Sequence, residues 1–501
     1  MASACLTLLI GALVLLTVYL IKKYTYWKRR GIPTASGVLP LLGNMLPVLT
    51  LRYSHLSYNV KVYDDHKEHS MVGYYKFLKP VLLVREPQLI KTVMQTNFSS
   101  FADTGMILRP DLDPLLSKNP FFNVGEAWSR ARKRMTNAFS NAKLKILHGA
   151  VNGVCKKFED FLNRQLSTSD KYEVELKQLF LKFTGEVVAN AGLGIEGYCF
   201  DDNKKSMAFY AMLEPLFKTN LFMGILQIIF FVPELRNFLR LRFIPKELDQ
   251  TFRGIVKENL QIRRNDPKER SDYLQVMIDM EKTDKQNIDE EAITAEALSL
   301  YVDGLETSSI TLSYLGFHLA THPDIQEKLR QEVKSKIAKY DGVLTFEALK
   351  EMTYMDQVIS ESQRCCPVVS ALKRQCTETI ELKGSDGLSC RVQPGTIVMI
   401  PNFSLQRDPK YWPDPELFDP ERFNEERKQD IVKMTHLPFG EGPRMCVGMK
   451  MAMLQMKSCV ATLLSKYKLE LSKKTQQPLK YVPHSFMLTP VGGIWVHISK
   501  I

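Results

Sequence analysis

The segment that decides the fold of this chain reads Pro438-Phe439-Gly440-Glu441-Gly442-Pro443-Arg444-Met445-Cys446-Val447-Gly448. An apolar-periodic stretch from Met449 to Lys466 follows it and predicts a helix. The first N–H groups of that helix would point at the Cys446 sulfur and favour the thiolate, which is a good axial ligand for iron. Glycines on either side would let the backbone approach a flat ligand closely. The alternative interpretation is an inert cysteine buried in a turn.

Five positions of this segment agree with a known signature at fixed offsets. Phe439, Gly442, Arg444, Cys446 and Gly448 match the Phe-x-x-Gly-x-Arg-x-Cys-x-Gly signature, and the chain therefore resembles the cytochromes P450. The resemblance implies that Cys446 ligates the iron of haem b (iron protoporphyrin IX). It also implies that the cofactor is bound by Phe439, Gly440, Arg444 and Gly448.

The N-terminal residues predict a membrane anchor. Ala2 to Ile21 is an uncharged run long enough to cross a hydrocarbon core as a helix, and basic residues follow it directly. Because the positive charge comes after the apolar run, an uncleaved anchor is favoured over a signal peptide, with the body of the protein on the cytosolic side. We expect an anchor over residues 1–21, a basic and Pro/Gly-containing neck over 22–44, and one catalytic domain over 45–501.

Composition narrows the class of protein. The nine cysteines are an odd number without CxxC spacing, which fits neither a disulfide framework nor a zinc site. The net charge of +12 is compatible with an anionic membrane surface or an acidic protein partner. Basic residues are dispersed rather than interleaved with aromatics in a stripe, so we expect no nucleic-acid binding.

A long helix is predicted from Asp289 to Thr321, capped by Asp289 and ended by His322-Pro323. Its middle reads Asp303-Gly304-Leu305-Glu306-Thr307-Ser308, where glycine and adjacent hydroxyl residues predict a local distortion. The segment is similar to the oxygen-groove motif of P450s, which implies that Glu306 and Thr307 relay protons during oxygen activation. The family has a small residue where this chain has Asp303, so the polarity and shape of the groove are open there. The alternative is an ordinary amphipathic helix.

Further basic residues are assigned by the same resemblance. Trp128 and Arg132 are four residues apart and share a helix face. In P450s such a pair donates to a haem propionate, and Arg374 stands where the family often places another propionate ligand.

A structural triad is expected from Glu361, Arg364 and Arg422. Glu361 and Arg364 lie three apart at the end of a predicted helix, and Arg422 belongs to Phe418-Asp419-Pro420-Glu421-Arg422-Phe423. The resemblance implies a buried network beneath the cysteine loop. Glu327 and Arg330 have the same spacing, and we interpret them as an exposed pair.

Gly192-Leu193-Gly194-Ile195-Glu196-Gly197 spells GxGxxG, but a dinucleotide site needs a strand before it and a helix after it. Here a helical stretch precedes and polar residues follow. We expect no nucleotide site, so electrons from NADPH would arrive only indirectly, through another protein.

The pattern also predicts strands and leaves one apolar run open. Two hairpins are expected, Val72–Phe77 with Val81–Val84 around Lys79-Pro80, and Ser485–Leu488 with Ile494–Ile498. A small antiparallel sheet is expected from Thr379–Leu382, Ser389–Val392 and Ile397–Ile400. Leu221–Val232 is too short to span a bilayer and is either buried core or a contact with the membrane surface.

The resemblance covers nearly the whole chain and is closest to microsomal, insect detoxification-type P450s. It implies a mainly α fold with a small β part after the N-terminal transmembrane helix. The expected activity is monooxygenation of a lipophilic small molecule, such as a plant toxin or insecticide, with electrons from NADPH through cytochrome P450 reductase and cytochrome b5 as an additional candidate partner. The expected location is the endoplasmic reticulum membrane. Alternatives are an endogenous lipid or hormone as substrate, a P450 that isomerises or dehydrates peroxides, and a non-catalytic haem-thiolate binding protein.

Overall fold

The computed structural model describes residues 2–213, 216, 233–266, 270–283, 289–483, 485 and 487–501. Its elements form two units, each of which is taken by itself here. Unit 1 consists of Met1–Gly105, Val369–Pro413 and Val432–Met445, and unit 2 of Met106–Val368, Asp414–Ile431 and Cys446–Ile501. The expected divisions at residues 21 and 44 stay a prediction.

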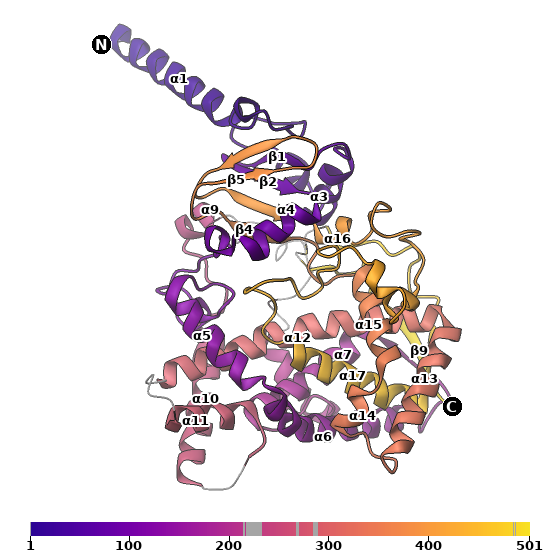
Figure 1. The fold of residues 1–501 in the computed structure, drawn as a ribbon. Coiled ribbons are helices and arrows are strands. Elements are labelled where there is room, and N and C mark those ends of the chain that lie inside the picture. Colours follow the sequence, from indigo (N-terminus) through magenta and orange to yellow (C-terminus); the bar gives the residue numbers. More distant parts are fainter. Residues whose placement is uncertain are drawn as a thin grey trace. The chain divides into compact units, whose positions relative to one another are not determined.

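Unit 1 begins with the predicted anchor as a helix, α1 (Ala2–Tyr24), which is long enough and apolar enough to cross a membrane. In Figure 1 it projects away from the strands of its unit. The helix ends on an aromatic junction. The Trp27 indole is fully buried, its Nε1 donates to the Tyr74 carbonyl at 3.1 Å, and its ring lies where a Cβ on Gly73 would approach to 2.3 Å. Tyr75 Oη donates to the Tyr24 carbonyl at 2.9 Å, so the end of α1 is fixed to a strand.

The larger sheet of unit 1 has the strand order β1-β2-β7-β4, with β1 Met71–Lys76, β2 Lys79–Val84, β7 Ile397–Ile400 and β4 Leu372–Gln375. The predicted first hairpin is present, but its turn is at Phe77-Leu78. Lys79 and Pro80 belong to β2 and lie opposite Lys76 and Tyr75. Proline is tolerated there because it is at the start of a strand.

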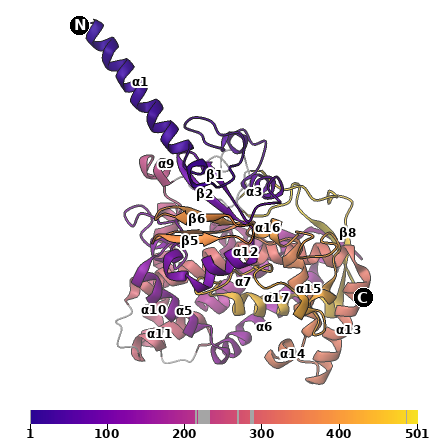
Figure 2. The ribbon, with the colours of Figure 1, turned by 45° about the horizontal axis from the view of Figure 1, so that its top comes forward.

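The prediction that residues 379–400 form one three-stranded sheet is wrong, because the third strand pairs elsewhere. β5 (Ile380–Lys383) and β6 (Ser389–Val392) form a two-stranded antiparallel ribbon, whose two strands lie side by side in Figure 2. β7 instead runs parallel to β2 and antiparallel to β4. The alternation of buried and half-buried residues in β7 fits pairing with β6 as well as pairing with β2 or β4, so the sequence pattern alone does not identify the partner strand.

The remaining helices of unit 1 are short. α4 (Pro87–Lys91) begins with a proline at the first helical position, where proline is tolerated because its missing N–H would have no partner. The others are η1 Lys28–Arg30, α2 Leu46–Leu49, α3 His55–Asp64, η2 Thr92–Thr96, η3 Phe98–Phe101 and α16 Asn402–Leu405.

Unit 2 is built around α12 (Glu290–Thr321), which has 32 residues and lies among the other helices of this unit in Figure 1. The Asp289 carboxylate accepts from the Ala292 N–H at 2.7 Å, so the predicted cap is confirmed. The helix packs most extensively against α7 (Leu176–Val187). The helix is continuous from residue 302 to residue 308, so the predicted distortion is absent from this structure. Its hydroxyl groups bond back to carbonyls of the preceding turn without breaking it.

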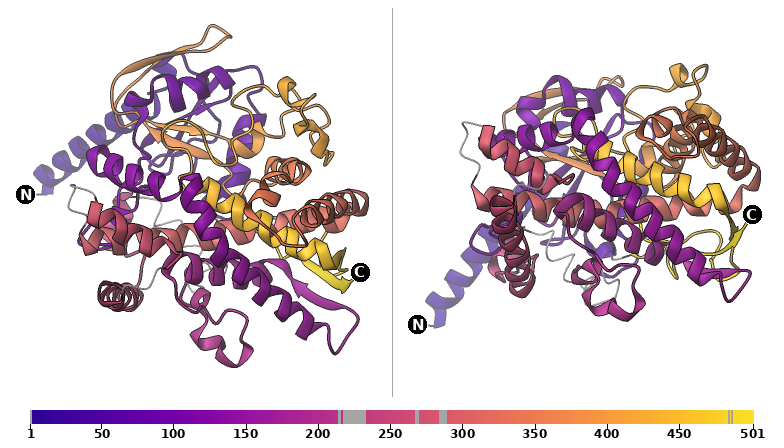
Figure 3. Two further views of the ribbon diagram at one scale, coloured as in Figure 1. Left: turned by 60° about the horizontal axis from the view of Figure 1, so that its bottom comes forward. Right: turned by 90° about the horizontal axis from the view of Figure 1, so that it is seen from below.

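The predicted helix after the cysteine is confirmed as α17 (Met449–Lys466), which packs beside α6 (Asn141–Gln165), as Figure 3 shows. The other helices of unit 2 are η4 Leu116–Lys118, α5 Gly125–Ala138, η5 Val188–Leu193, η6 Asp202–Met207, η7 Phe209–Met212, α9 Pro233–Phe238, α10 Lys246–Asn265, α11 Tyr273–Thr283, α13 Pro323–Lys339, α14 Phe346–Lys350, α15 Thr353–Cys365, η9 Pro420–Phe423 and η10 Lys428–Asp430.

The prediction of a C-terminal hairpin from residues 485–488 and 494–498 is wrong. β9 (Trp495–Lys500) lies between β3 (Tyr172–Glu175) and β8 (Tyr467–Leu471), and it pairs with both antiparallel. Residues 485, 487 and 488 form no named strand. β3, one of the two partners of β9, lies more than 300 residues earlier in the chain, a distance at which local patterns carry no information about pairing.

Two further predictions concern residues of unit 2. The GxGxxG stretch follows α7 and ends the helical turn η5, with Gly194 in the left-handed region, so a helix precedes it as the sequence predicted. Leu221–Val232 lies outside the described residues.

Candidate functional site

Cys446 stands at the start of α17, where Gly448 is the N-terminal cap residue. Its side chain keeps accessible surface, yet the surrounding protein raises the pKa of the thiol above its usual value. The N–H groups of Gly448 and Met449 lower it again, as does the charge of Arg132. The Cys446 sulfur is therefore accessible and lies at the start of a helix whose N–H groups favour its thiolate, which suits a metal-ligating role.

Trp128 and Arg132 lie on one face of α5, as their spacing predicted. Both side chains are half-buried. Dehydration lowers the pKa of Arg132, and the negative charge of a Cys446 thiolate opposes that shift. The charges of Arg132 and Cys446 therefore act on each other within unit 2.

The middle of α12 contributes a second accessible surface. Asp303 keeps accessible surface although dehydration raises the pKa of its carboxyl to about 6, and its charge acts on Cys446. Thr307 is one turn further along the same face, and its Oγ1 donates to the Asp303 carbonyl at 2.5 Å. Gly304 follows Asp303, and a Cβ placed on it would lie 3.8 Å from the Val188 side chain of η5, an ordinary van der Waals contact.

Glu306 points elsewhere. Its side chain is almost fully buried and pairs with Lys177 of α7, with 2.5 Å between Lys177 Nζ and Glu306 Oε1. Burial raises the pKa of Glu306, and Lys177 opposes that shift. Its Oε2 has no hydrogen-bond partner among the described residues. The structure thus joins Glu306 to Lys177 and leaves it unbonded to the hydroxyl of Thr307.

Two buried hydrogen bonds fix α12 at this point. Gln455 Nε2 of α17 donates to Ser308 Oγ at 2.7 Å, and Thr184 Oγ1 of α7 lies 3.0 Å from the Leu305 carbonyl, to which it donates. Each bond acts within a turn of Thr307. The first bond joins α12 to α17, the helix that begins after Cys446, and the second joins α12 to α7.

The expected triad is present. Glu361 and Arg364 are both fully buried on α15 and form a bidentate pair, with Arg364 Nε to Glu361 Oε2 at 2.7 Å and Arg364 Nη2 to Glu361 Oε1 at 2.8 Å. Arg422 of η9 approaches Glu361 Oε1 at 3.5 Å and donates to the Asp414 carbonyl at 2.8 Å. Asp419 N–H also donates to Glu361 Oε1 at 2.9 Å, so one carboxylate fixes the loop that carries Arg422.

For the pair Glu327 and Arg330, the predicted exposure is confirmed for Glu327 and wrong for Arg330. Glu327 is exposed, but the Arg330 guanidinium is buried and donates to the carbonyls of Leu464 and Tyr467 at 3.1 and 3.3 Å. The identical spacing could not reveal this, because these acceptors come from the distant end of α17 and the strand after it.

In unit 1, the residues before the cysteine form a tight loop. Gly440 and Gly442 both have positive φ, and a Cβ on Gly442 would lie 1.9 Å from the Met94 carbonyl oxygen. Arg444 is buried, and its Nε donates to the Ala102 carbonyl at 2.7 Å. Phe439 precedes this turn.

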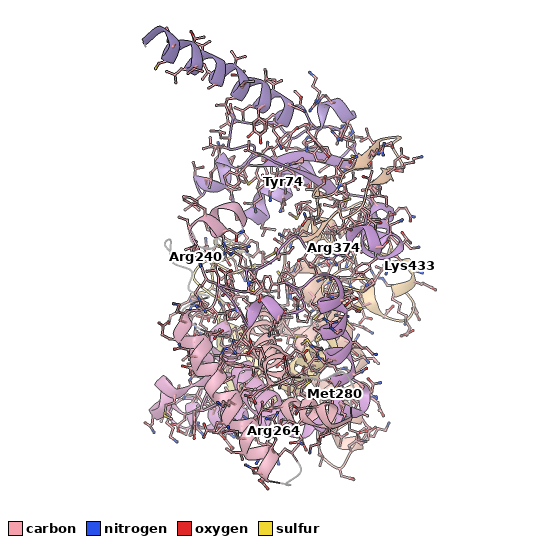
Figure 4. The ribbon with its side chains drawn as sticks, turned by 90° about the vertical axis from the view of Figure 1, so that its left-hand side faces the viewer. Tyr74, Arg240, Arg264, Met280, Arg374 and Lys433 are labelled. Carbon is pink, nitrogen blue, oxygen red and sulfur yellow. The ribbon has the colours of Figure 1, made fainter. Side chains whose placement is uncertain are left out.

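Arg374 of β4 is buried in unit 1 and is labelled in Figure 4. Its Nη1 donates to the Lys373 carbonyl at 2.9 Å, and its Nε has no hydrogen-bond partner among the described residues. Dehydration alone lowers the pKa of this guanidinium to about 10. A buried cation that no carboxylate compensates is costly, so this position favours an anionic ligand.

The sequence matches a known family over most of its length. The family described as Cytochrome P450 matches residues 33–497. The chain belongs to the cytochrome P450 family. It is 31% identical to "Cytochrome P450 9e2" of Blattella germanica, with 97% of this chain and 96% of the relative covered. It is 32% identical to "Cytochrome P450 6a2" of Drosophila melanogaster, with 96% of each chain covered, and 30% identical to "Probable cytochrome P450 28a5" of the same species over both whole chains.

This P450 is a monooxygenase whose relatives are insect P450s, as the sequence predicted. The family implies haem, and its residues fit that group. In unit 2, the accessible thiol of Cys446 and the cationic Arg132 whose charge acts on it suit an iron-bearing, anionic group. In unit 1, the buried guanidinium of Arg374 suits an anionic ligand. Among the described residues, no cluster of three His, Cys, Asp or Glu side chains could hold a metal ion.

Sequence reasoning missed three residues that shape this site. Lys177 pairs with Glu306, Asn119 donates to Asp303, and Gln455 holds Ser308. Each reaches α12 from a different element. None stands in a motif, and no local signal in the sequence pointed to any of them.

Proposed function

We propose that this P450 oxidises lipophilic xenobiotics at the endoplasmic reticulum membrane, inserting one atom of dioxygen with electrons from NADPH through cytochrome P450 reductase. Haem b bound at Cys446 supplies the oxygen activation. The observation that carries the proposal is the accessible sulfur of Cys446, which receives N–H groups from the start of α17 and the charge of Arg132.

The protein groups in the proposal have separate tasks. Cys446 ligates the iron, and bonding to a cation removes the proton that burial otherwise keeps on the thiol. The carboxylates of the cofactor are bound by Trp128, Arg132, Arg374 and Arg444. The surface on which the cofactor ring lies is formed by Phe439, Gly440 and Gly448. The triad of Glu361, Arg364 and Arg422 supports the loop.

Thr307 and Glu306 deliver protons in this proposal. The Thr307 hydroxyl proton is directed at the Asp303 carbonyl in the structure, so it reaches the reacting oxygen only after rotation about χ1. Threonine in a helix occupies two χ1 rotamers, which makes that rotation inexpensive. Glu306 is buried with Oε2 unbonded among the described residues, and it moves its proton once its contact with Lys177 loosens.

The membrane setting rests on α1. The charges that follow its apolar segment, Lys22, Lys23, Lys28, Arg29 and Arg30, favour a cytosolic body by the positive-inside rule. A cytosolic body gives access to the reductase, and cytochrome b5 is a second electron donor in the proposal.

The first test is the carbon monoxide difference spectrum of membranes carrying the chain. We expect the Soret band of thiolate-ligated haem from the wild type, and its loss in Cys446→His. Cys5→Ser is the matched control, because Cys5 is another accessible cysteine of the described chain. Absence of the band from folded wild-type protein, or its retention in Cys446→His, refutes the assignment. Product formed without any reductase would instead indicate the peroxide-rearranging alternative.

The proton path has its own test. Thr307→Ala is expected to keep haem but to lower the ratio of product formed to NADPH consumed, with the difference appearing as hydrogen peroxide. Thr311→Ala is the control, since Thr311 donates to the Thr307 carbonyl at 2.9 Å one turn further along α12. Equal ratios in wild type and Thr307→Ala would contradict the relay.

A further inference from the structure

Asp303 carries a carboxylate that the activity of the family does not require. It is on the accessible face of α12, one turn before Thr307, and its charge acts on Cys446. Asn119 Nδ2 donates to Asp303 Oδ2 at 2.8 Å. The carboxylate is therefore part of the same face that presents Thr307.

The Asn119 side chain is fixed in position beside that carboxylate. Its side chain is 1% exposed, and its Oδ1 accepts from the Phe121 N–H at 2.7 Å, which directs the amide nitrogen at Asp303. Its own N–H donates to the Leu116 carbonyl at 3.0 Å, closing the turn that follows η4. An amide donor in a fixed position stabilises the ionised carboxylate rather than the neutral acid.

No cation among the described residues compensates this charge. Within the part of the chain that the structure describes, no Lys, Arg or His approaches Asp303 within ion-pairing distance, and the Asn119 amide alone opposes the dehydration that raises its pKa. Asp303 differs in this from Glu306, three residues later, which has Lys177 at 2.5 Å. An unpaired, dehydrated carboxylate is costly unless a ligand brings the opposite charge.

The Thr307 hydroxyl leaves this carboxylate unchanged, because it is bonded to the Asp303 carbonyl oxygen. Small-molecule sites combine apolar surface with a few fixed polar groups, and a lipophilic ligand with one positive charge fits an accessible carboxylate of this kind.

We propose that Asp303, held by Asn119, is a specificity-determining carboxylate that binds the cationic nitrogen of lipophilic amines and quaternary ammonium compounds. By the same charge it disfavours fatty acids and other anionic lipids. This inference rests on the proposed function and narrows its substrate class.

The test compares two probes that differ by one atom. Octanoylcholine carries a trimethylammonium head, and its carbon isostere carries a tert-butyl group in the same place. The quaternary nitrogen has no lone pair, so it cannot ligate iron. Equilibrium dialysis of each probe against the haem-loaded, full-length chain in phosphatidylcholine nanodiscs, with empty nanodiscs subtracted, gives the ratio of dissociation constants. Hexanoyl and decanoyl pairs extend the range of ligand length.

We expect the wild type to bind a choline ester at least about tenfold more tightly than its isostere, the scale of one modest charge interaction. Asp303→Asn is expected to bring the ratio close to one, and Asp303→Glu to restore part of it. Glu425→Gln is the control: it removes the same charge from a side chain that is 87% exposed, and it should keep the wild-type ratio.

Two results overturn the inference. One is a wild-type ratio near one or below for every ester pair, which needs no variant. The other is a preference that Asp303→Asn retains. Because the readout is binding, it is independent of turnover. A chain that prefers the choline esters but oxidises nothing would support this inference and contradict the proposed function. A chain that oxidises neutral compounds but shows no preference for the choline esters would support the proposed function and contradict this inference.

Discussion

Replacing Glu361 by glutamine is expected to be among the most destabilising single changes of a polar residue in this protein. The carboxylate accepts two bonds from Arg364 and one from the Asp419 N–H, and it has Arg422 at 3.5 Å. Both Glu361 and Arg364 are completely buried. Glutamine leaves one oxygen for these donors and turns its own amide donors toward an arginine.

The size of the effect follows from that geometry. Each charge-assisted bond contributes about 1.5–3 kcal/mol, and breaking a buried pair by removing one partner costs about 3–5 kcal/mol. Glu327→Gln is the matched control, because it has the same spacing to its arginine. Glu327 is exposed, and the buried Arg330 keeps the carbonyls of Leu464 and Tyr467 as acceptors. We expect it to cost about 0–1 kcal/mol.

The assay is denaturant unfolding of the haem-loaded chain in detergent, followed by far-ultraviolet circular dichroism and, in parallel, by haem absorbance. The two probes separate loss of the fold from loss of the cofactor, which matters because a bound cofactor breaks two-state behaviour. If Glu361→Gln costs no more than Glu327→Gln, the buried network does not have the energetic role that its geometry indicates.

Three further predictions concern other parts of the molecule. Gly442→Ala is expected to lower both the melting temperature and the haem content of purified protein, because a Cβ there would lie 1.9 Å from the Met94 carbonyl oxygen at a φ of +73°; unchanged haem content would contradict it. Trp27→Ala should cost about 3–5 kcal/mol in denaturant unfolding, and Gly73→Ala should also destabilise, since the indole occupies the space of that Cβ. The pKa of Asp303 is raised from 3.8 to about 6 in the folded chain, so the free energy of unfolding should fall as pH rises from about 4 to about 6, and less so in Asp303→Asn; parallel pH curves for the two proteins would be the contrary result.

Local signals were sufficient for the parts of the fold that depend on neighbouring residues. Asp289 and Pro323 bound α12, and the loop of glycines and prolines before Cys446 gave the start of α17, because caps and breakers act within a few residues. Strand partners were not predictable in the same way. β7 and β9 each pair with strands far away in sequence, and alternation within a strand does not identify its neighbour.

The candidate site shows the same division. Family signatures pointed to Cys446, Arg132 and Thr307, and in the structure the charges of Arg132 and Cys446 act on each other. Which group each side chain contacts was decided by distant elements, as with Lys177 beside Glu306. The burial of Arg330 was missed for this reason, since its acceptors come from residues 464 and 467.

The aromatic junction at the end of α1 has a mechanical consequence. The Trp27 ring packs on β1 at Gly73, and Tyr75 is hydrogen-bonded to the Tyr24 carbonyl. These contacts restrict rotation of α1 relative to the sheet of unit 1. In a bilayer, a tilt of α1 would therefore change the orientation of that sheet as well. Helix tilt depends on bilayer thickness, so we expect the orientation of the sheet of unit 1 to differ between bilayers of different thickness.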